Sequence, residues 1–193
     1  MRTAEINRKT NETDIKMTLS LEGGDRKIST GIGFFDHMLT AFAVHGGFGL
    51  ELDVKGDLEV DCHHTIEDVG IVLGKAIAEA VGDKRGIARF GSCLLPMDES
   101  LAECVLDISG RPYFVINAPE TLQFGSVGKF DCCMAEEFFR AVAMNSGLTL
   151  HLNIRYGRNA HHMIEAMFKA FARALKQAVE IKGSEILSSK GTL

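Results

Sequence analysis

The stretch His63-His64-Thr65-Ile66-Glu67 recurs 98 residues later as His161-His162-Met163-Ile164-Glu165, so both copies read HHxIE. Each copy begins a segment with the hydrophobic spacing of a helix. Residues four apart lie on nearly the same side of a helix, so we expect His63 above Glu67 and His161 above Glu165. Four of the seven histidines of the chain fall in these two doublets. Imidazoles and carboxylates within reach of one another are typical metal ligands, and the repetition predicts two related metal sites.

The similarity between the two halves extends beyond the doublets. Residues 45–54 match residues 145–154, and residues 34–37 match residues 134–137, so that His37 falls opposite Glu137. The offset of 100 between these segments, against 98 between the doublets, is what insertions and deletions in loops leave. The pattern indicates an internal duplication in which each half contains a hairpin, a helix, a strand and a helix.

Hydrophobic periodicity predicts the same elements in each half. In the first half we expect strands over residues 2–9, 13–21, 27–29 and 50–54, and helices over 34–44 and 65–81. In the second half we expect strands over residues 89–95, 101–108, 113–117 and 148–154, a loop over 119–129, and helices over 130–144 and 161–181. Because the strands cluster in hairpins, the fold class is α+β, with the helices packed together between two mixed β-sheets. We expect a single domain, 1–193, built from half-repeats of about 1–87 and 88–182, followed by a polar tail, 183–193.

The composition excludes several classes of protein. A hydrophobic content of 46% and a charged content of 24% are typical of a folded domain rather than a disordered one. A net charge of −5 without a basic block argues against a nucleic-acid partner. We expect no membrane span and no signal peptide, because the chain lacks the apolar runs that either needs. Five cysteines without CxxC spacing indicate reduced thiols in a cytoplasmic protein.

Several other residues have both a functional and a simpler explanation. Cys62 beside His63 could bind metal, although a small buried residue explains it better, and a structural role also explains His45 and His151 better. The four cations Arg89, Arg111, Lys169 and Lys190 could together bind a phosphate group, although each alone is more simply a surface charge. Glu12 matches Glu99 at an offset of 87, which suggests acid–base chemistry; exposed hairpin carboxylates are the simpler explanation.

Longer stretches of the chain resemble the imidazoleglycerol-phosphate dehydratase family. They are Gly33-Phe34-Phe35-Asp36-His37-Met38-Leu39, Asp61-Cys62-His63-His64-Thr65-Ile66-Glu67-Asp68-Val69-Gly70, Pro96-Met97-Asp98-Glu99, Asp107-Ile108-Ser109-Gly110-Arg111-Pro112 and Gly157-Arg158-Asn159-Ala160-His161-His162. The resemblance covers essentially the whole chain, so we expect no phosphatase domain of the kind that is fused to some relatives. It implies an enzyme of histidine biosynthesis that dehydrates D-erythro-imidazoleglycerol phosphate to imidazole acetol phosphate.

The resemblance also implies a cofactor, an assembly and a set of site residues. Family members bind two Mn ions per active site, and other divalent metals of the Fe, Zn, Co and Ni group suit the same donors. They assemble as 24-subunit homo-oligomers with sites between subunits. The implied metal ligands are His37, His63, His64, Glu67, His161, His162 and Glu165. The implied substrate-binding residues are Glu12, His37, His45, His63, Glu67, Arg89, Arg111, His161, Lys169, Ser188, Ser189 and Lys190.

One position departs from part of the family. Many members have EHFF where this chain has Glu136-Glu137-Phe138-Phe139, so a carboxylate replaces a ligand imidazole. A carboxylate can still bind Mn²⁺, and we therefore include Glu137 among the candidate ligands. Which glutamate contacts the metal is left open by the sequence.

The chemistry implied by the resemblance requires a base. The hydrogen that is removed lies on a carbon beside the imidazole ring and is not acidic by itself. Metals that hold both ring nitrogens would favour an imidazolate, which can expel hydroxide through a diazafulvene-like intermediate. A carboxylate must also move the carbon-bound proton, and the candidates are Glu12, Glu67 and Glu165. We expect Glu67 and Glu165 to act chiefly as ligands and Glu12 to transfer the proton.

Two other functions fit the same residue types. A binuclear metallohydrolase would also use clusters of histidine and carboxylate, and it would hydrolyse phosphate esters. A metal-storage or metal-sensing shell would bind many ions per chain without turnover. The convergent basic residues and the additional glutamate favour an enzyme over storage.

Overall fold

The computed structural model describes residues 1–193, and its first sheet comes from the N-terminal half. Its strands lie in the spatial order β1 (Thr3–Lys9), β2 (Thr13–Ser20), β4 (Gly49–Gly56) and β3 (Arg26–Ser29). Along β2, Ile15 and Met17 are buried whereas Lys16 between them is exposed. This alternation gives the sheet one face for the core and one for solvent. The three strands β1, β2 and β4 are antiparallel, and β3 runs parallel to β4.

The second sheet repeats this topology with strands from the C-terminal half. Its order is β5 (Phe90–Met97), β6 (Ser100–Asp107), β10 (Thr149–Tyr156) and β7 (Tyr113–Asn117). The pairs β5–β6 and β6–β10 are antiparallel, and the edge strand β7 runs parallel to β10. The two mixed sheets therefore confirm the internal duplication and the α+β class that the sequence predicts.

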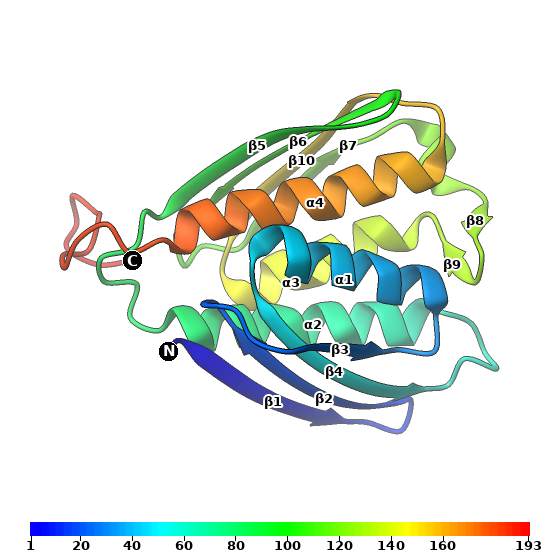
Figure 1. Cartoon of the computed structure of the whole chain (residues 1–193), viewed down its shortest axis with the longest axis horizontal. Coiled ribbons are helices and arrows are strands. Elements are labelled where there is room, and N and C mark those ends of the chain that lie inside the picture. The colour runs from blue at the N-terminus through cyan, green and yellow to red at the C-terminus, as the bar shows by residue number, and fades with distance from the viewer.

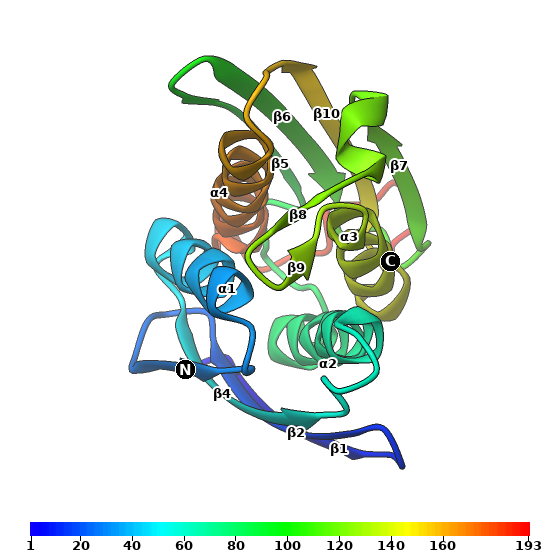
Figure 2. The ribbon, with the colours of Figure 1, turned by 90° about the vertical axis from the view of Figure 1, so that its right-hand side faces the viewer.

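Four helices fill the space between the sheets (Figures 1 and 2). They are α1 (Gly33–Gly46), α2 (His63–Val81), α3 (Met134–Ser146) and α4 (Ala160–Val179). The helices pair across the duplication, because α1 packs on α4 and α2 packs on α3. Residues of α1 are thereby brought to the HHxIE segment of α4, and residues of α3 to that of α2. None of the helices has both the length and the apolar character that crossing a membrane needs.

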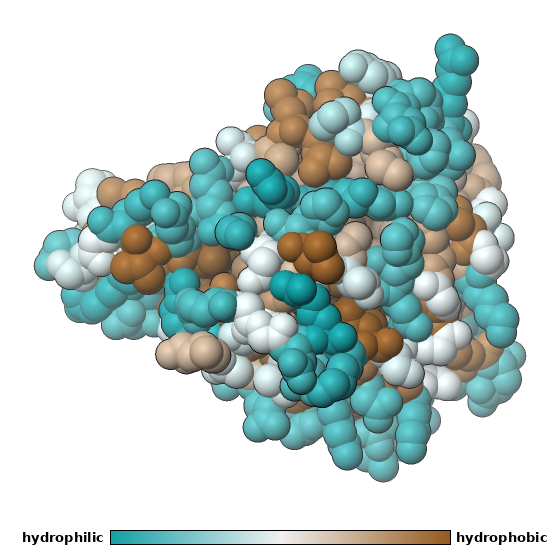
Figure 3. All heavy atoms as spheres, viewed as in Figure 1, coloured by the Kyte–Doolittle hydropathy of each residue, from teal (hydrophilic) through white to brown (hydrophobic).

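Phenylalanines from three helices form the centre of the core. The ring of Phe138 on α3 stacks on that of Phe168 on α4, with centroids 5.0 Å apart, and meets the edge of Phe35 on α1 at 5.4 Å. All three side chains are fully buried. On the outside, the face seen in Figure 3 is mostly polar, with small separate groups of hydrophobic side chains. The apolar residues of the chain are therefore used chiefly between the sheets.

Two predicted boundaries were wrong. The helix expected from residue 130 begins at Met134, because Phe130–Asp131 forms β9 and pairs with β8 (Ser126–Val127). Phe130 is fully buried against the ring of Phe34 at 5.3 Å, so it resembled a residue on the buried side of a helix. The loop expected over 119–129 contains the 3₁₀ turn η1 (Glu120–Gln123) as well as β8. The last helix ends at Val179 rather than at residue 181, since Ile181 forms a β-bridge with Ile87.

Candidate metal and substrate site

Both HHxIE segments begin a helix, and a polar side chain two residues upstream fixes each beginning. The side-chain oxygen of Asn159 accepts a hydrogen bond from the backbone N–H of His161 at 2.9 Å. In the other half, a carboxylate oxygen of Asp61 accepts from the N–H of His63 at 2.7 Å. These contacts satisfy N–H groups that the helix itself leaves free. Each doublet is thus held in the first helical turn, where its two rings point in different directions.

The first histidine of the α4 doublet joins a compact group of three donors. His161 Nε2 lies 3.0 Å from Glu165 Oε2 one turn later, as the i,i+4 spacing predicts. His37 on α1 approaches the same oxygen at 3.4 Å through its Nε2. The donor atoms of His37, His161 and Glu165 all lie within 4.8 Å of one another, and no other three histidine, cysteine or acidic residues are grouped so closely.

Glu165 is buried, so its charge needs partners. Lys169 Nζ lies 2.5 Å from Glu165 Oε1 on the side away from the two imidazoles. Burial alone would raise the pKa of Glu165, but Lys169, His37 and His161 outweigh it and lower the pKa below its ordinary value. The carboxylate is therefore ionised at neutral pH, as a metal ligand must be. Two imidazoles and one ionised carboxylate fit Mn²⁺ and the neighbouring transition metals.

The corresponding group on α2 is more open. His63 Nε2 lies 3.6 Å from Glu67 Oε2, and both side chains are nearly half exposed. Glu137 on α3, the counterpart of His37, is 3.5 Å from Arg140 Nε. Glu137 therefore has an arginine partner in this chain, and His63, Glu67 and Glu137 do not form a three-donor group.

The second histidine of each doublet contacts carboxylates from a neighbouring loop. His64 Nδ1 lies 2.9 Å from Asp57 Oδ2, and its Nε2 lies 3.8 Å from Glu12. The acceptor Asp57 raises the pKa of His64, although desolvation of the ring opposes part of the effect. Sequence reasoning missed Asp57, because this residue has no acidic counterpart in the other half. Its place directly after a strand that leads to an HHxIE segment is the only available signal.

His162 has an analogous environment in the other half. Its Nδ1 lies 2.6 Å from Glu99 Oε2, and its Nε2 lies 3.6 Å from Asp98 Oδ2. Hydrogen bonding to Glu99 raises the pKa of His162. The same hydrogen bond, together with one from the backbone N–H of Asn159, holds the pKa of Glu99 well below its ordinary value. Both residues of the Asp98-Glu99 hairpin turn thus face the second histidine of their half. Glu12, the counterpart of Glu99, likewise faces the second histidine of the first half.

Lys169 lies beside Glu165, whereas the other expected phosphate-binding residues lie at the opposite end of α4. The guanidinium of Arg89 pairs with Asp107 at 2.7 Å and donates to the carbonyl of Leu187 in the tail at 2.7 Å. A Cβ at Gly110 would lie 3.2 Å from the backbone of Leu193, so the neighbouring, exposed Arg111 is near the tail that contains Ser188, Ser189 and Lys190. The tail lies beyond the C-terminal end of α4 (Figure 1). Arg89 N–H donates to the carbonyl of Ala178, which is about 25 Å along the helix from His161 at 1.5 Å per residue. One chain alone therefore does not bring Arg89 to its own metal-ligand group.

The remaining candidates have simpler environments. His45 is half-buried at the end of α1, where desolvation followed by the charges of Lys169 and Arg173 lowers its pKa. It thus lies beside Lys169 and close to the α4 group. Cys62 is buried in the hydrophobic core, and burial raises the pKa of its thiol. His151 is exposed on β10, away from both doublets.

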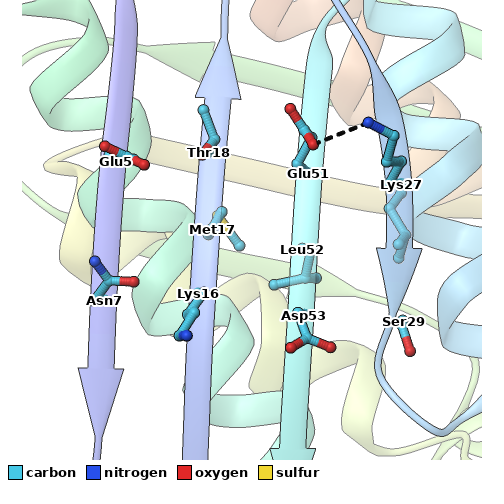
Figure 4. A pocket seen from close by; sticks show the side chains of 11 residues that line it. Glu5, Asn7, Lys16, Met17, Thr18, Lys27, Ser29, Glu51, Leu52 and Asp53 are labelled. Carbon is cyan, nitrogen blue, oxygen red and sulfur yellow. Dashed lines mark hydrogen bonds and ion pairs between the residues drawn. The ribbon is translucent and has the colours of Figure 1, made fainter.

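A hollow of about 580 Å³ lies on the outer face of the first sheet, but its carboxylates do not form a close group of metal donors (Figure 4). It is lined by side chains that point away from the helices, among them Lys16, Lys27, Glu51 and Asp53. Lys27 Nζ pairs with Glu51 across the strands at 3.4 Å. No histidine reaches this surface, so the candidate site lies at the first turns of the helices and not on the sheet.

Comparison with known proteins identifies the family. The imidazoleglycerol-phosphate dehydratase (IGPD) family model matches residues 30–175. The imidazoleglycerol-phosphate dehydratase of Methanosarcina mazei is 55% identical over the full length of both chains, and that of Acetivibrio thermocellus is 54% identical over 98% of this chain and 97% of the relative.

Solved structures agree with this result. The crystal structure of the Staphylococcus aureus dehydratase matches with a TM-score of 0.82 and 44% identity, over 91% of this chain and 97% of that one. IGPD from Pyrococcus furiosus matches with a TM-score of 0.84 and 34% identity, over 97% and 100% of the two chains. The chain belongs to the imidazoleglycerol-phosphate dehydratase family, and it is a hydro-lyase of histidine biosynthesis.

Proposed function

We propose that the chain, as a single dehydratase domain, 1–193, with half-repeats of about 1–87 and 88–182, converts D-erythro-imidazoleglycerol phosphate to imidazole acetol phosphate at a site that holds two Mn²⁺ ions. The group formed by His37, His161 and Glu165 carries the proposal, because it combines metal-ligand chemistry with an ionised buried carboxylate. A second ion would be bound by His63 and Glu67, together with His64, His162 and Glu137. Bound divalent ions would favour the imidazolate form of the substrate ring and so make the neighbouring carbon able to lose its proton.

The proton transfer itself falls to a carboxylate of the chain. Glu67 and Glu165 both face imidazoles, which suits ligands and leaves them little freedom to exchange protons with carbon. The carboxylate of Glu12 is half exposed on the loop before β2 and lies 3.8 Å from His64. We assign Glu12 to the proton transfer at the carbon beside the ring.

Phosphate recognition supports an assembly with shared sites. Arg89, Arg111, Ser188, Ser189 and Lys190 provide cations and donors at one end of the molecule, and Lys169 and His45 lie near the metal ligands at the other. Because about 25 Å of helix separates Arg89 from His161, a substrate that contacts both must lie between two chains. This separation favours a homo-oligomer, for which we propose 24 subunits. The biosynthetic role and the five free thiols favour the cytoplasm.

Metal stoichiometry of the Mn-reconstituted protein tests the proposal directly. We expect about two ions per chain in the intact protein and fewer in His63→Ala and in His161→Ala, since each substitution removes a ligand from a different ion. His151→Ala is the matched control, because His151 is exposed away from both doublets. Retention of no ion by the intact protein, or an equal count in all variants, would contradict the metal sites. Dehydration of the imidazole substrate by the same preparations then tests the reaction.

A further inference from the structure

The second histidine of each doublet has a carboxylate on its Nδ1, yet the two carboxylates come from different places in the repeat. For His162 the partner is Glu99, which immediately precedes β6. For His64 the partner is Asp57, which follows β4. The residue that corresponds to Glu99 is Glu12, immediately before β2, and it is not the residue that holds His64 Nδ1. We propose that Asp57 and Glu99 are positioning residues that orient His64 and His162 for metal binding, and that Asp57 thereby leaves Glu12 free for proton transfer.

The side chain of Asp57 has no polar partner in the fold other than His64. Its Oδ1 is buried without any hydrogen-bond donor, and its Oδ2 faces only His64 Nδ1. A buried acceptor without a donor lowers the stability of the folded state, so the contact with His64 is the only role that the surroundings offer this carboxylate. A buried polar atom without a hydrogen-bond partner is typical of a functional position.

Glu99 is fixed much more firmly than its counterpart. Its Oε1 accepts hydrogen bonds from the backbone N–H groups of Arg158 at 3.2 Å and Asn159 at 2.8 Å, and from the hydroxyl of Ser100 at 3.1 Å. Its other oxygen lies 2.6 Å from His162. Apart from Ser100, which begins β6, these partners immediately precede α4 or lie in its first turn, so Glu99 connects the hairpin turn to the histidine doublet. A carboxylate held by four donors cannot easily approach a substrate carbon.

Glu12 has none of these restraints. The backbone of Glu12 is held in place, because its N–H donates to the hydroxyl of Thr10 and its carbonyl accepts from the N–H of Asp57 at 3.1 Å. Its side chain, in contrast, makes no hydrogen bond and is 52% exposed. Its carboxylate lies near the Nε2 side of the His64 ring, where a bound ion and its substrate would lie. The two equivalent glutamates therefore have different roles. In the first half Asp57 orients the histidine, so Glu12 is not needed for that role.

The orientation follows from the chemistry of imidazole. A carboxylate on Nδ1 favours the tautomer that carries its proton there, which leaves the Nε2 lone pair for an ion. It also fixes the plane of the ring and strengthens the ligand. Loss of such a partner lowers metal affinity by about 10- to 100-fold in metal sites of this kind.

The inference rests on the proposed ligand role of His64 and is tested on the intact assembled protein. Binding of Mn²⁺ is followed by electron paramagnetic resonance, with kcat measured at saturating Mn²⁺ and the unfolding of the metal-free protein in urea. We expect Asp57→Ala to weaken Mn²⁺ binding about 10- to 100-fold without loss of metal-free stability. Asp57→Asn should recover much of this binding, because an amide oxygen still accepts from Nδ1–H. Asp53→Ala is the matched control, since Asp53 is an exposed carboxylate on the outer face of the same strand.

Glu12 and Glu99 should then give opposite results. Glu12→Gln should retain Mn²⁺ affinity within about twofold while kcat falls by about 10²- to 10⁴-fold. Glu99→Ala should weaken Mn²⁺ binding, with kcat at saturating Mn²⁺ reduced far less than in Glu12→Gln. Unchanged Mn²⁺ affinity in Asp57→Ala, or the reverse pattern for the two glutamates, overturns the inference.

His64→Ala separates the inference from the proposed function beneath it. If this variant keeps full Mn²⁺ affinity, the proposed ligand role of His64 is wrong and the inference falls with it. If His64→Ala weakens binding while Asp57→Ala does not, the ligand role stands and only the positioning role of Asp57 is overturned.

Discussion

Gly70 on α2 lies directly against the carbonyl oxygen of Phe138 on α3, so close that a Cβ at Gly70 would be 2.8 Å from it. One turn later, a Cβ at Gly74 would lie 2.7 Å from the carbonyl oxygen of Val142. The equivalent positions on α4 are Phe168 and Ala172, and the ring of Phe168 meets that of Phe35 on α1 with centroids 6.5 Å apart. The two helices of the α2–α3 pair are therefore in backbone contact, whereas aromatic side chains lie between the two helices of the α1–α4 pair.

The close approach of α2 and α3 predicts a cost for any side chain at Gly70. We expect Gly70→Ala to lower the free energy of unfolding by about 1–3 kcal/mol, because the new methyl group meets backbone that cannot rotate away. Urea denaturation of the metal-free protein measures the change. Gly33→Ala is the control, since a Cβ at Gly33 on α1 meets nothing within 4 Å. Equal stability of the two variants would contradict the tight contact.

Lys169 is expected to stabilise the metal-free protein through Glu165. Lys169→Met removes the cation that lies 2.5 Å from a buried carboxylate, and we expect a loss of about 1–3 kcal/mol at neutral pH. Mn²⁺ should restore most of the loss, because the ion would supply the missing positive charge. Lys176→Met, on an exposed part of the same helix, should change little. Denaturation with chelator and with Mn²⁺ measures both effects, and an equal loss in the two variants would argue against the pairing.

Metal affinity should depend on pH through the second histidines. Hydrogen bonds that the rings donate to Asp57 and Glu99 raise the pKa values of His64 and His162 above the ordinary value of 6.5. Protons therefore compete with Mn²⁺ already above pH 6.5, and the apparent affinity should fall as the pH decreases.

The same raised pKa values affect the metal-free fold with the opposite sign. The protonated rings stabilise it fully below pH 6.5, and this contribution is lost as the pH rises through the raised pKa values.

Mn²⁺ titrations between about pH 5.5 and pH 8.5 measure the competition between protons and the metal ion. A flat affinity across this range would show that His64 and His162 do not bind the ion.

The distance between the two ends of α4 predicts complementation between inactive chains. His161→Ala removes a metal ligand, and Arg111→Ala removes an exposed candidate for phosphate binding at the other end. Each variant alone should be nearly inactive. If sites form between chains, random co-assembly of the two should restore about a quarter of the sites. The measurement is the activity of co-expressed chains, and activity no higher than that of either variant would exclude shared sites.

The C-terminal tail should contribute to substrate binding. Arg89 donates to the carbonyl of Leu187, so the tail is held next to the candidate phosphate residues. Deletion of residues 183–193 should raise KM by at least about 10-fold while metal stoichiometry is retained, because charge-assisted contacts to the phosphate are lost. Steady-state kinetics test this expectation. An unchanged KM would mean that the tail has no part in the site.

The features of this protein that depend on local periodicity follow from its amino-acid sequence alone. Alternation along residues 13–21 and helical spacing after each HHxIE segment indicate their elements, because one face of each must be buried wherever it packs. The contact of His161 with Glu165 follows from helix geometry alone. The duplication could also be read directly, since both halves retain the same order of elements. Phe130 is the instructive error, because a buried aromatic residue looks the same on a helix and on a two-residue strand.

Which residues of the site come into contact depends on how the elements pack in three dimensions. That α1 packs on α4, and not on the helix of its own half, brings His37 to Glu165, and no local pattern contains this information. The pairing of Asp57 with His64 and of Glu137 with Arg140 likewise depends on how loops and helices lie after packing. The separation of Arg89 from His161 is set by the length and direction of α4. These relationships arise from contacts between segments far apart in the chain, which a single sequence does not record.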